Sequence, residues 1–273
     1  MMALLQQPIW RFYDQSISAI PTSPLTSFAM DDTLCELVGQ LQSPPTLRTW
    51  VHDASVVLGI QDHRLPYIQQ AMRYLVTQGY QPIVRNSGGL AVVLDKGVLN
   101  LSLVFSEQTK AMSIDEGYEA MLAFIRLLLP EATIEAYEIE GSYCPGSYDL
   151  SIDGKKFAGI SQRRLRQGVA VQIYLCVEGS GSERAALIEK FYAQGLQQQV
   201  TKFSYPVIRP QVMASLNELI GQSLTVQDIV VRAYRVLATL GQVQATSFNA
   251  EENTRYAFYL QRVLDRNAKM LAK

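Results

Sequence analysis

The sequence contains only two histidines and three cysteines among its 273 residues. Neither His52 nor His63 stands at a metal-ligand spacing from any cysteine, and no triad of cysteine, histidine and acid can be assembled from local sequence. No metal site is therefore expected. Cys35, Cys144 and Cys176 are odd in number and widely separated, which is typical of a protein of the reducing cytoplasm rather than of a disulfide framework. At least one thiol should be free.

A strong net charge and a long apolar run are also absent. The formal net charge is −1, so nothing indicates the concentrated basic surface that binding to nucleic acid requires. No uncharged apolar run reaches the roughly 18 residues of a membrane-spanning helix, and the start lacks the features of a signal peptide. We therefore expect a cytoplasmic protein with no nucleic acid or membrane partner.

The composition is that of an ordinary globular protein, with 48% hydrophobic and 18% charged residues. Because single hydrophobic cores stop growing at roughly 250 to 300 residues, we expect one domain spanning 1–273. Its proline-rich start, which contains a short helical pattern around 31–41, is predicted to be an irregular lead-in. A sheet-containing core and a helical tail are expected to follow it. The boundaries of these three segments are 1–45, 46–208 and 209–273.

Apolar periodicity distinguishes strands from helices along the core. Period-two or β-branched patterns predict strands at 50–59, 82–93, 98–105, 148–152, 155–160 and 168–177. Patterns of period 3.6 predict helices at 67–78, 114–129, 182–194 and 226–240, the last with Thr225 as N-cap. We interpret His52 as a strand residue and the segment 62–64 as a solvated turn. The mixture indicates an α/β or α+β fold around a mostly antiparallel sheet.

Cys144 lies in Tyr143-Cys144-Pro145-Gly146, a segment typical of a loop, which favours an exposed thiol. The thiolate is the reactive form, and a cation such as Lys156 or Arg163 would favour it. The alternative is a structural cysteine without chemistry. Cys176, within an apolar strand, is predicted to be a small core residue.

The Lys155-Lys156 pair follows Asp153-Gly154, a dipeptide that favours a tight hairpin turn. Strand alternation directs one lysine of the pair inward or towards a cleft. In a simple hairpin Ser151 opposes Lys156, which leaves Cys144 about 23 Å back along the strand at roughly 3.3 Å per residue. The cysteine loop must therefore fold back across the sheet if it is to reach the lysine. The alternative is two solvated lysines beside a turn.

The segment Arg85-Asn86-Ser87-Gly88-Gly89-Leu90-Ala91 joins one predicted strand to another. Its paired glycines would let a substrate approach the backbone where side chains would obstruct it. The alternative is a turn or bulge that needs only the flexibility of glycine.

Three blocks of sequence follow one another in a fixed order: VRNSGGLAVV at 84–93, GVLNLS at 97–102 and YDLSIDGKKFAGISQRR at 148–164. Together they resemble the signature of the lipoate-protein ligase A and biotin-protein ligase superfamily, over about residues 30–240. The resemblance implies a catalytic α/β domain with a mostly antiparallel mixed sheet flanked by helices. It also implies a short helical C-terminal tail in place of a full ligase accessory domain.

The chain departs from the ligase pattern at informative positions. Ligases of this superfamily typically carry two arginines and three consecutive glycines where this chain has Arg85-Asn86 and Gly88-Gly89-Leu90, which argues against adenylation. Cys144 stands just upstream of Asp149, as it does in the cysteine-dependent octanoyltransferases of the superfamily. These positions and the context at 143–146 are most similar to the branch that takes octanoyl groups from the glycine cleavage H protein.

The resemblance implies an acyltransferase of lipoate biosynthesis that needs no cofactor. It would move an octanoyl group from the H protein to lysines of lipoyl domains in 2-oxoacid dehydrogenase complexes. Cys144 would form the acyl thioester, and Lys156 would contact the acyl carbonyl and assist charge and proton transfer. An apolar tunnel should hold the acyl chain. The residues expected to bind substrate are Arg85, Ser87, Gly88, Gly89, Ala91 and Gly159.

Three alternatives stay open at this point. An octanoyltransferase that draws on octanoyl acyl carrier protein would share the chemistry and differ only in its donor. An ATP-dependent lipoate ligase would form an adenylate and tolerate the loss of Cys144. A non-catalytic module would bind lipoyl domains without ever forming a covalent adduct.

Overall fold

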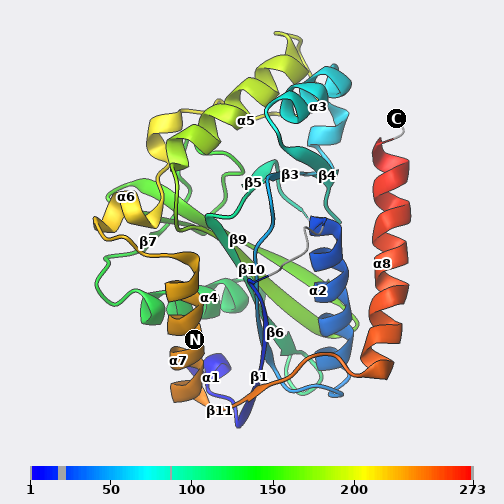
Figure 1. The fold of residues 1–273 in the computed structure, drawn as a ribbon, viewed down its shortest axis with the longest axis vertical. Helices are drawn as coiled ribbons and strands as arrows, with labels where there is room; N and C mark the ends of the chain where they lie inside the picture. Colours follow the sequence, from blue (N-terminus) through cyan, green and yellow to red (C-terminus); the bar gives the residue numbers. More distant parts are fainter. Residues whose placement is uncertain (1, 18–22, 87, 272–273) are drawn as a thin grey trace.

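The computed structural model describes residues 2–17, 23–86 and 88–271, and a mixed sheet of eight strands runs through its middle (Figure 1). These strands are β1 Ile9–Gln15, β2 Thr46–Trp50, β6 Val98–Ser106, β7 Glu135–Ala136, β8 Asp149–Ile152, β9 Lys155–Leu165, β10 Gly168–Cys176 and β11 Gln242–Ala245. Their order is β11-β1-β2-β6-β10-β9-β8-β7, with parallel pairing only where β1 meets β11 and β2. The smaller sheet, in the order β4-β3-β5, contains β3 Ser55–Leu58, β4 Gln81–Val84 and β5 Val92–Leu94. The predicted mostly antiparallel mixed sheet is confirmed.

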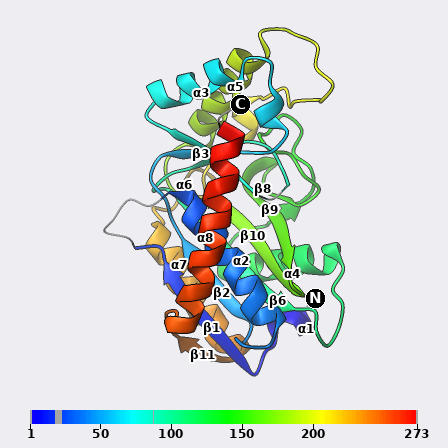
Figure 2. The same ribbon diagram turned by 90° about the vertical axis from the view of Figure 1, so that its right-hand side faces the viewer.

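Helices cover both faces of the large sheet. On one face α2 (Pro24–Gly39) packs against β6, β9 and β10, and α8 (Ala250–Leu271) lies along α2 (Figure 2). On the other face α4 (Ile114–Leu128) contacts β9 and β10, and α7 (Val226–Leu240) contacts α4. The remaining helices are α1 (Met2–Leu5), α3 (Ile68–Thr77), α5 (Gly181–Leu196), α6 (Leu216–Ile220) and the 3-10 turns η1 (Asp62–Arg64) and η2 (Pro210–Val212). None of the helices in the described ranges is both long and apolar enough to cross a bilayer.

Elements with a clear period and a local end signal lie where the sequence predicts them. Ser113 is the N-cap of α4 and forms a capping box with Glu116, and Thr225 caps α7 in the same way with Asp228. Asp153 and Gly154 both have positive φ angles, 49° and 71°, and make the hairpin turn between β8 and β9. The helices predicted at 114–129 and 226–240 and the hairpin are thus confirmed.

The expectation of an irregular lead-in at 1–45 is wrong, although the short helical pattern expected around 31–41 does lie in a helix, which begins earlier. β1 lies between β11 and β2 in the large sheet, and α2 is a helix of 16 residues. Ser23 caps α2 by accepting from Leu25 N, and Pro24 occupies the first turn, where a proline starts a helix instead of breaking it. Because the sheet and α8 cover it from two sides, α2 is buried almost all round and shows no amphipathic stripe.

Two predicted strands are also corrected. The strand expected at 50–59 is divided, since β2 ends at Trp50 and β3 begins at Ser55, and His52 lies in the loop between them. The strand expected at 82–93 is divided in the same way into β4 and β5, with the glycine segment as the loop that joins them.

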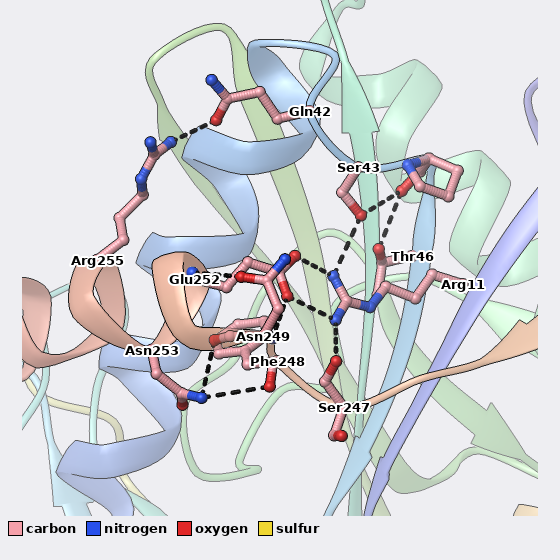
Figure 3. A network of polar contacts seen from close by, with 11 residues as sticks. Arg11, Gln42, Ser43, Thr46, Ser247, Phe248, Asn249, Glu252, Asn253 and Arg255 are labelled. Atoms are coloured by element: carbon pink, nitrogen blue, oxygen red, sulfur yellow. Dashed lines mark hydrogen bonds and ion pairs between the residues drawn. The ribbon is translucent and has the colours of Figure 1, made fainter.

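The predicted helical tail contains α6, α7 and α8, and it also contributes β11, which pairs with β1 at the edge of the large sheet. A buried ion pair joins this part of the chain to the first strand (Figure 3). Arg11 Nη1 and Nη2 donate to the two carboxylate oxygens of Glu252 at 2.6 and 3.1 Å, and Nη2 also donates to Ser247 O at 2.8 Å. The two ends of the chain are therefore held in one fold.

Candidate active site

Cys144 lies in the loop between β7 and β8, where its backbone adopts a left-handed φ of 47°. This conformation is uncommon for a residue other than glycine and is concentrated at functional sites. The sulfur accepts from Leu90 N at 3.2 Å and from Arg85 Nη2 at 3.4 Å. Two N–H donors directed at one sulfur favour a negative charge there, as a nucleophilic thiolate requires.

Lys156, on β9, is fully buried and directed at the cysteine loop. Its ammonium forms an ion pair with Asp149 Oδ1 at 2.8 Å and donates to the carbonyls of Tyr143 and Cys144 at 2.9 and 3.0 Å. It also lies 3.2 Å from Ser142 Oγ. Ser151 opposes Lys156 in the hairpin, so the loop does fold back to reach the lysine. The inward lysine of the pair is thus identified as Lys156, whereas Lys155 is exposed.

Asp149 completes this charge arrangement and was not assigned a role from the sequence. Burial raises the pKa of its carboxyl, although the Lys156 ammonium and the N–H groups of Ile139 and Gly146 act in the opposite direction. Its Oδ2 accepts from Ile139 N at 3.2 Å and from Ser142 Oγ at 3.3 Å. The carboxylate therefore ties β8 to the segment that precedes the cysteine.

The cation beside the sulfur is not Arg163. Arg163 forms an ion pair with Asp32 on α2, at 2.6 Å between Nε and Oδ1. It lies far along β9 from the hairpin, whereas Arg85 comes from the end of β4. Arg163 was expected as a possible cation near the thiol, but the extended course of β9 carries it away from the hairpin.

The glycine segment wraps around Arg85. Arg85 Nη2 donates to Leu90 O, and a Cβ on Gly89, whose φ is 106°, would collide with the Arg85 guanidinium. Gly88 lines the adjoining cavity, and Ala91 is buried with its N–H 3.5 Å from Tyr192 Oη. These contacts fix the shape of the loop beside the cavity. Ser87 lies outside the described residues.

Asp62, in the segment expected to be a solvated turn, is linked to this loop through Tyr192, whose hydroxyl contacts both Asp62 and Ala91 N. Asp62 has no exposed surface and accepts from Tyr192 Oη at 2.8 Å and from Gly59 N at 2.7 Å. Burial raises the pKa of Asp62 to about 6 against the opposing hydrogen bonds. The expectation of a solvated turn is therefore wrong for Asp62, because Tyr192 packs over it from a helix distant in sequence, whereas Arg64 in the same turn is exposed.

A cavity of about 330 Å³ adjoins the sulfur, within the range of roughly 300 to 1,000 Å³ of small-molecule sites. Cys144, Arg85 and Gly89 lie on its wall, together with Gly159, where a Cβ would come within 2.9 Å of the Tyr174 ring. The apolar part of the wall includes Phe28, Trp50, Val57, Val92, Leu94 and Ile173. An apolar space beside a nucleophile is suited to an acyl chain.

The other two cysteines are core residues. Cys35 on α2 and Cys176 at the end of β10 are both fully buried, and burial raises the pKa of both thiols. Cys176 is thus a core residue, as predicted. Cys144 is partly exposed and lies on the cavity wall, which leaves it as the cysteine positioned for chemistry.

The large sheet, the cysteine loop and the apolar cavity beside the sulfur are features expected of a catalytic domain that acts on acyl groups. Residues 23–238 match the family described as lipoyl protein ligase A/B catalytic domain, and the chain belongs to this family. It is 68% identical to the octanoyl-[GcvH]:protein N-octanoyltransferase of Lysinibacillus sphaericus, over 100% of this chain and 99% of the relative. It is 54% identical to the enzyme of the same name from Anoxybacillus flavithermus, over 99% of each chain. The prediction of an acyltransferase in this superfamily is confirmed.

Solved structures agree at the level of the fold. Lipoate-protein ligase A bound with ATP superimposes with a TM-score of 0.70 at 17% sequence identity, covering 94% of this chain and 95% of the ligase. A bi-partite lipoate protein ligase from Thermoplasma acidophilum gives a TM-score of 0.62 at 17% identity, covering 94% and 93%. The predicted ligase-like fold is therefore confirmed.

Proposed function

We propose that this chain transfers an octanoyl group from the octanoylated glycine cleavage H protein to lysines of lipoyl domains through a thioester on Cys144. The observation that carries the proposal is the sulfur of Cys144, which accepts from Leu90 N and Arg85 Nη2 at the wall of an apolar cavity. The names of the two relatives supply the donor and the acyl group. The thioester and the lipoyl-domain acceptor are part of the proposal.

The first half-reaction cleaves the amide that joins the octanoyl group to a lysine of the donor. The Cys144 thiolate attacks the amide carbonyl carbon, the carbon–sulfur bond forms and the carbon–nitrogen bond breaks. The departing amine takes up the proton that the thiol gave up. The oxygen that becomes negative during attack needs a donor, and the N–H of Leu90 and the guanidinium of Arg85 lie beside the reacting sulfur.

The second half-reaction restores the free enzyme. The amine of an acceptor lysine attacks the thioester carbonyl, so that the carbon–nitrogen bond forms and the carbon–sulfur bond breaks. The proton that the amine loses passes to the departing sulfur and restores the Cys144 thiol. Lys156 is our second catalytic residue, with its ammonium held 3.0 Å from the Cys144 carbonyl by Asp149. Its charge offsets the negative charge that develops on the acyl oxygen and on the leaving sulfur.

The cavity supplies the acyl slot in this proposal, lined by Arg85, Gly88, Gly89 and Gly159 among others. Each buried methylene of the acyl chain contributes about 0.8 kcal/mol of transfer free energy. Ser87 and Ala91 remain predicted substrate-binding residues of the same loop. We place the reaction in the cytoplasm, because three free cysteines suit a reducing compartment.

Mass spectrometry of the intact protein after incubation with octanoyl H protein tests the proposal. We expect an octanoyl adduct that peptide mapping assigns to Cys144 and that is absent from the Cys144→Ala variant. Cys35→Ala is the matched control and should load normally. Octanoyl transfer by Cys144→Ala would reject the thioester, and loading from octanoyl acyl carrier protein alone would reassign the donor. Exchange between ATP and pyrophosphate would instead indicate a ligase.

A further inference from the structure

Four neighbouring strands contribute one residue each to a row on the floor of the cavity, next to the proposed reactive cysteine. Trp50, Asn100, Tyr174 and Gly159 stand side by side across β2, β6, β10 and β9. Tyr143, the residue before the cysteine, stacks on Tyr174 with 5.9 Å between ring centroids. The Asn100 amide is occupied by Trp50 O at 3.3 Å. This row therefore presents mainly aromatic surface to the acyl slot.

The next row on the same face is polar and consists of Arg48, Ser102, Gln172 and Ser161. Asp31 of α2 lies over it and binds three of the four. Its Oδ2 accepts from Gln172 Nε2 at 2.5 Å and from Ser102 Oγ at 2.9 Å, and its Oδ1 accepts from Arg48 Nη1 at 2.9 Å. Asp31 and Arg48 are almost completely buried as an ion pair.

Gln172 is the side chain through which this buried cluster meets the cavity. Both Gln172 and Ser161 line the cavity, with 3.4 Å between Ser161 Oγ and Gln172 Oε1. Successive residues on one face of a strand are about 7 Å apart, so the aromatic floor extends for only a few methylene lengths before the carboxamide.

We propose that Gln172, anchored by Asp31, sets the upper limit on the length of the acyl chain. This inference rests on the proposed use of the cavity as the acyl slot. An octanoyl chain ends against the carboxamide. A longer chain must displace Gln172 from Asp31, which removes a hydrogen bond from a buried carboxylate and places methylenes against polar groups that cannot reach water.

The test compares rates of Cys144 loading from H protein carrying hexanoyl, octanoyl, decanoyl or dodecanoyl groups. The unaltered enzyme is expected to lose at least tenfold in rate from octanoyl to decanoyl. Gln172→Ala should reverse this loss and raise decanoyl loading relative to octanoyl by about tenfold, since each methylene newly accommodated is worth about fourfold. Gln172→Thr, which suits a strand better, provides a second variant with the same expected direction.

Ser102→Ala is the matched control, because Ser102 binds the same carboxylate oxygen of Asp31 but does not line the cavity. It should keep the preference for octanoyl. An unchanged preference in folded Gln172→Ala and Gln172→Thr would overturn the length limit while leaving the thioester intact. A complete lack of adduct on Cys144 with every chain length would instead overturn the proposed function together with it.

Discussion

At the reactive sulfur, one donor belongs to the backbone and the other to a side chain that can be replaced. Arg85 Nη2 lies 3.4 Å from Cys144 Sγ. Replacing Arg85 by Met should slow alkylation of Cys144 by iodoacetamide, and its loading, by about 10- to 100-fold, since a hydrogen bond to a charged group is worth about 1.5 to 3 kcal/mol. Arg85→Lys, which keeps the charge, should recover part of the rate. Equal rates in the unaltered enzyme and Arg85→Met would show that the guanidinium does not act on the sulfur.

Asp62 predicts a pH dependence with a defined sign. Burial raises its pKa from an unfolded value near 3.8 to about 6, so the folded state binds more protons between these values. Its contribution to the free energy of unfolding therefore falls as pH rises from about 4 to 6 and is constant above. Asp62→Asn should remove this slope, and the difference between the two proteins should change by up to about 3 kcal/mol.

Urea unfolding of both proteins at several pH values between 4.5 and 7.5 measures that difference. Other titrating groups cancel because they are common to the two chains. A difference that stays flat across the range would mean that Asp62 titrates near its ordinary value and is not a buried acid.

The proposed reacting residues were easier to predict from the sequence than the groups around them. Cys144 and Lys156 belong to recognisable blocks, and the register of the hairpin already required the loop to fold back. The partner of the sulfur was misjudged because Arg85 reaches it from another strand, while Arg163 turns away to Asp32. Contacts that depend on which distant helix covers a strand, such as the one with Asp32, have no local pattern in the chain.

Among the elements, α8 offers the clearest test of what holds the fold together. Glu252 binds the buried guanidinium of Arg11 through both oxygens. Glu252→Gln leaves that charge without its counterion, and we expect a loss of about 3 to 5 kcal/mol in the free energy of unfolding. Glu251→Gln is the control. Glu251 is exposed, and its ion pair with Arg255, at 3.7 Å, is open to solvent. Its replacement should therefore change stability by less than about 0.5 kcal/mol.

The Arg11–Glu252 ion pair also predicts how the free energy of unfolding depends on pH. Burial acts to raise the pKa of Glu252, but the hydrogen bonds from Arg11 and Asn249 outweigh it and leave this pKa below its usual value. The stabilisation is therefore present above the unfolded pKa of about 4.5 and is lost as pH falls through the lower folded value. Similar chemical unfolding curves for Glu252→Gln and Glu251→Gln would contradict this account of the docking of α8.

Elements were predictable where one face alone is buried. α4 has a clear apolar stripe and a capping box, and it begins and ends close to the predicted residues. α2 is covered by the sheet and by α8, so its buried residues follow no clear period. Only a short helical pattern around 31–41 was therefore recognised, within a segment otherwise expected to be irregular. β1 and β11 pair with each other across more than 200 residues, and no local signal specifies such a partner.

At the scale of the whole molecule, the strand order places the buried ion pair and the proposed catalytic residues near opposite ends of the large sheet. β11 and β1, with the ion pair to α8, form one end of the large sheet, whereas β9 and β8 carry Lys156 and Asp149 near the other end. In the proposed mechanism, donor and acceptor proteins each present a lysine arm to the same sulfur. The two cannot occupy it together, so the reaction should proceed in two separable halves.

A single-turnover chase tests this central claim most directly. The enzyme is loaded with octanoyl H protein, separated from the donor, and then mixed with a lipoyl domain. We predict that the octanoyl group leaves Cys144 and appears on the lipoyl-domain lysine in equal amount, without ATP. An adduct that stays on the enzyme while fresh donor still supports transfer would contradict the account, because Cys144 would then hold the acyl group off the reaction path.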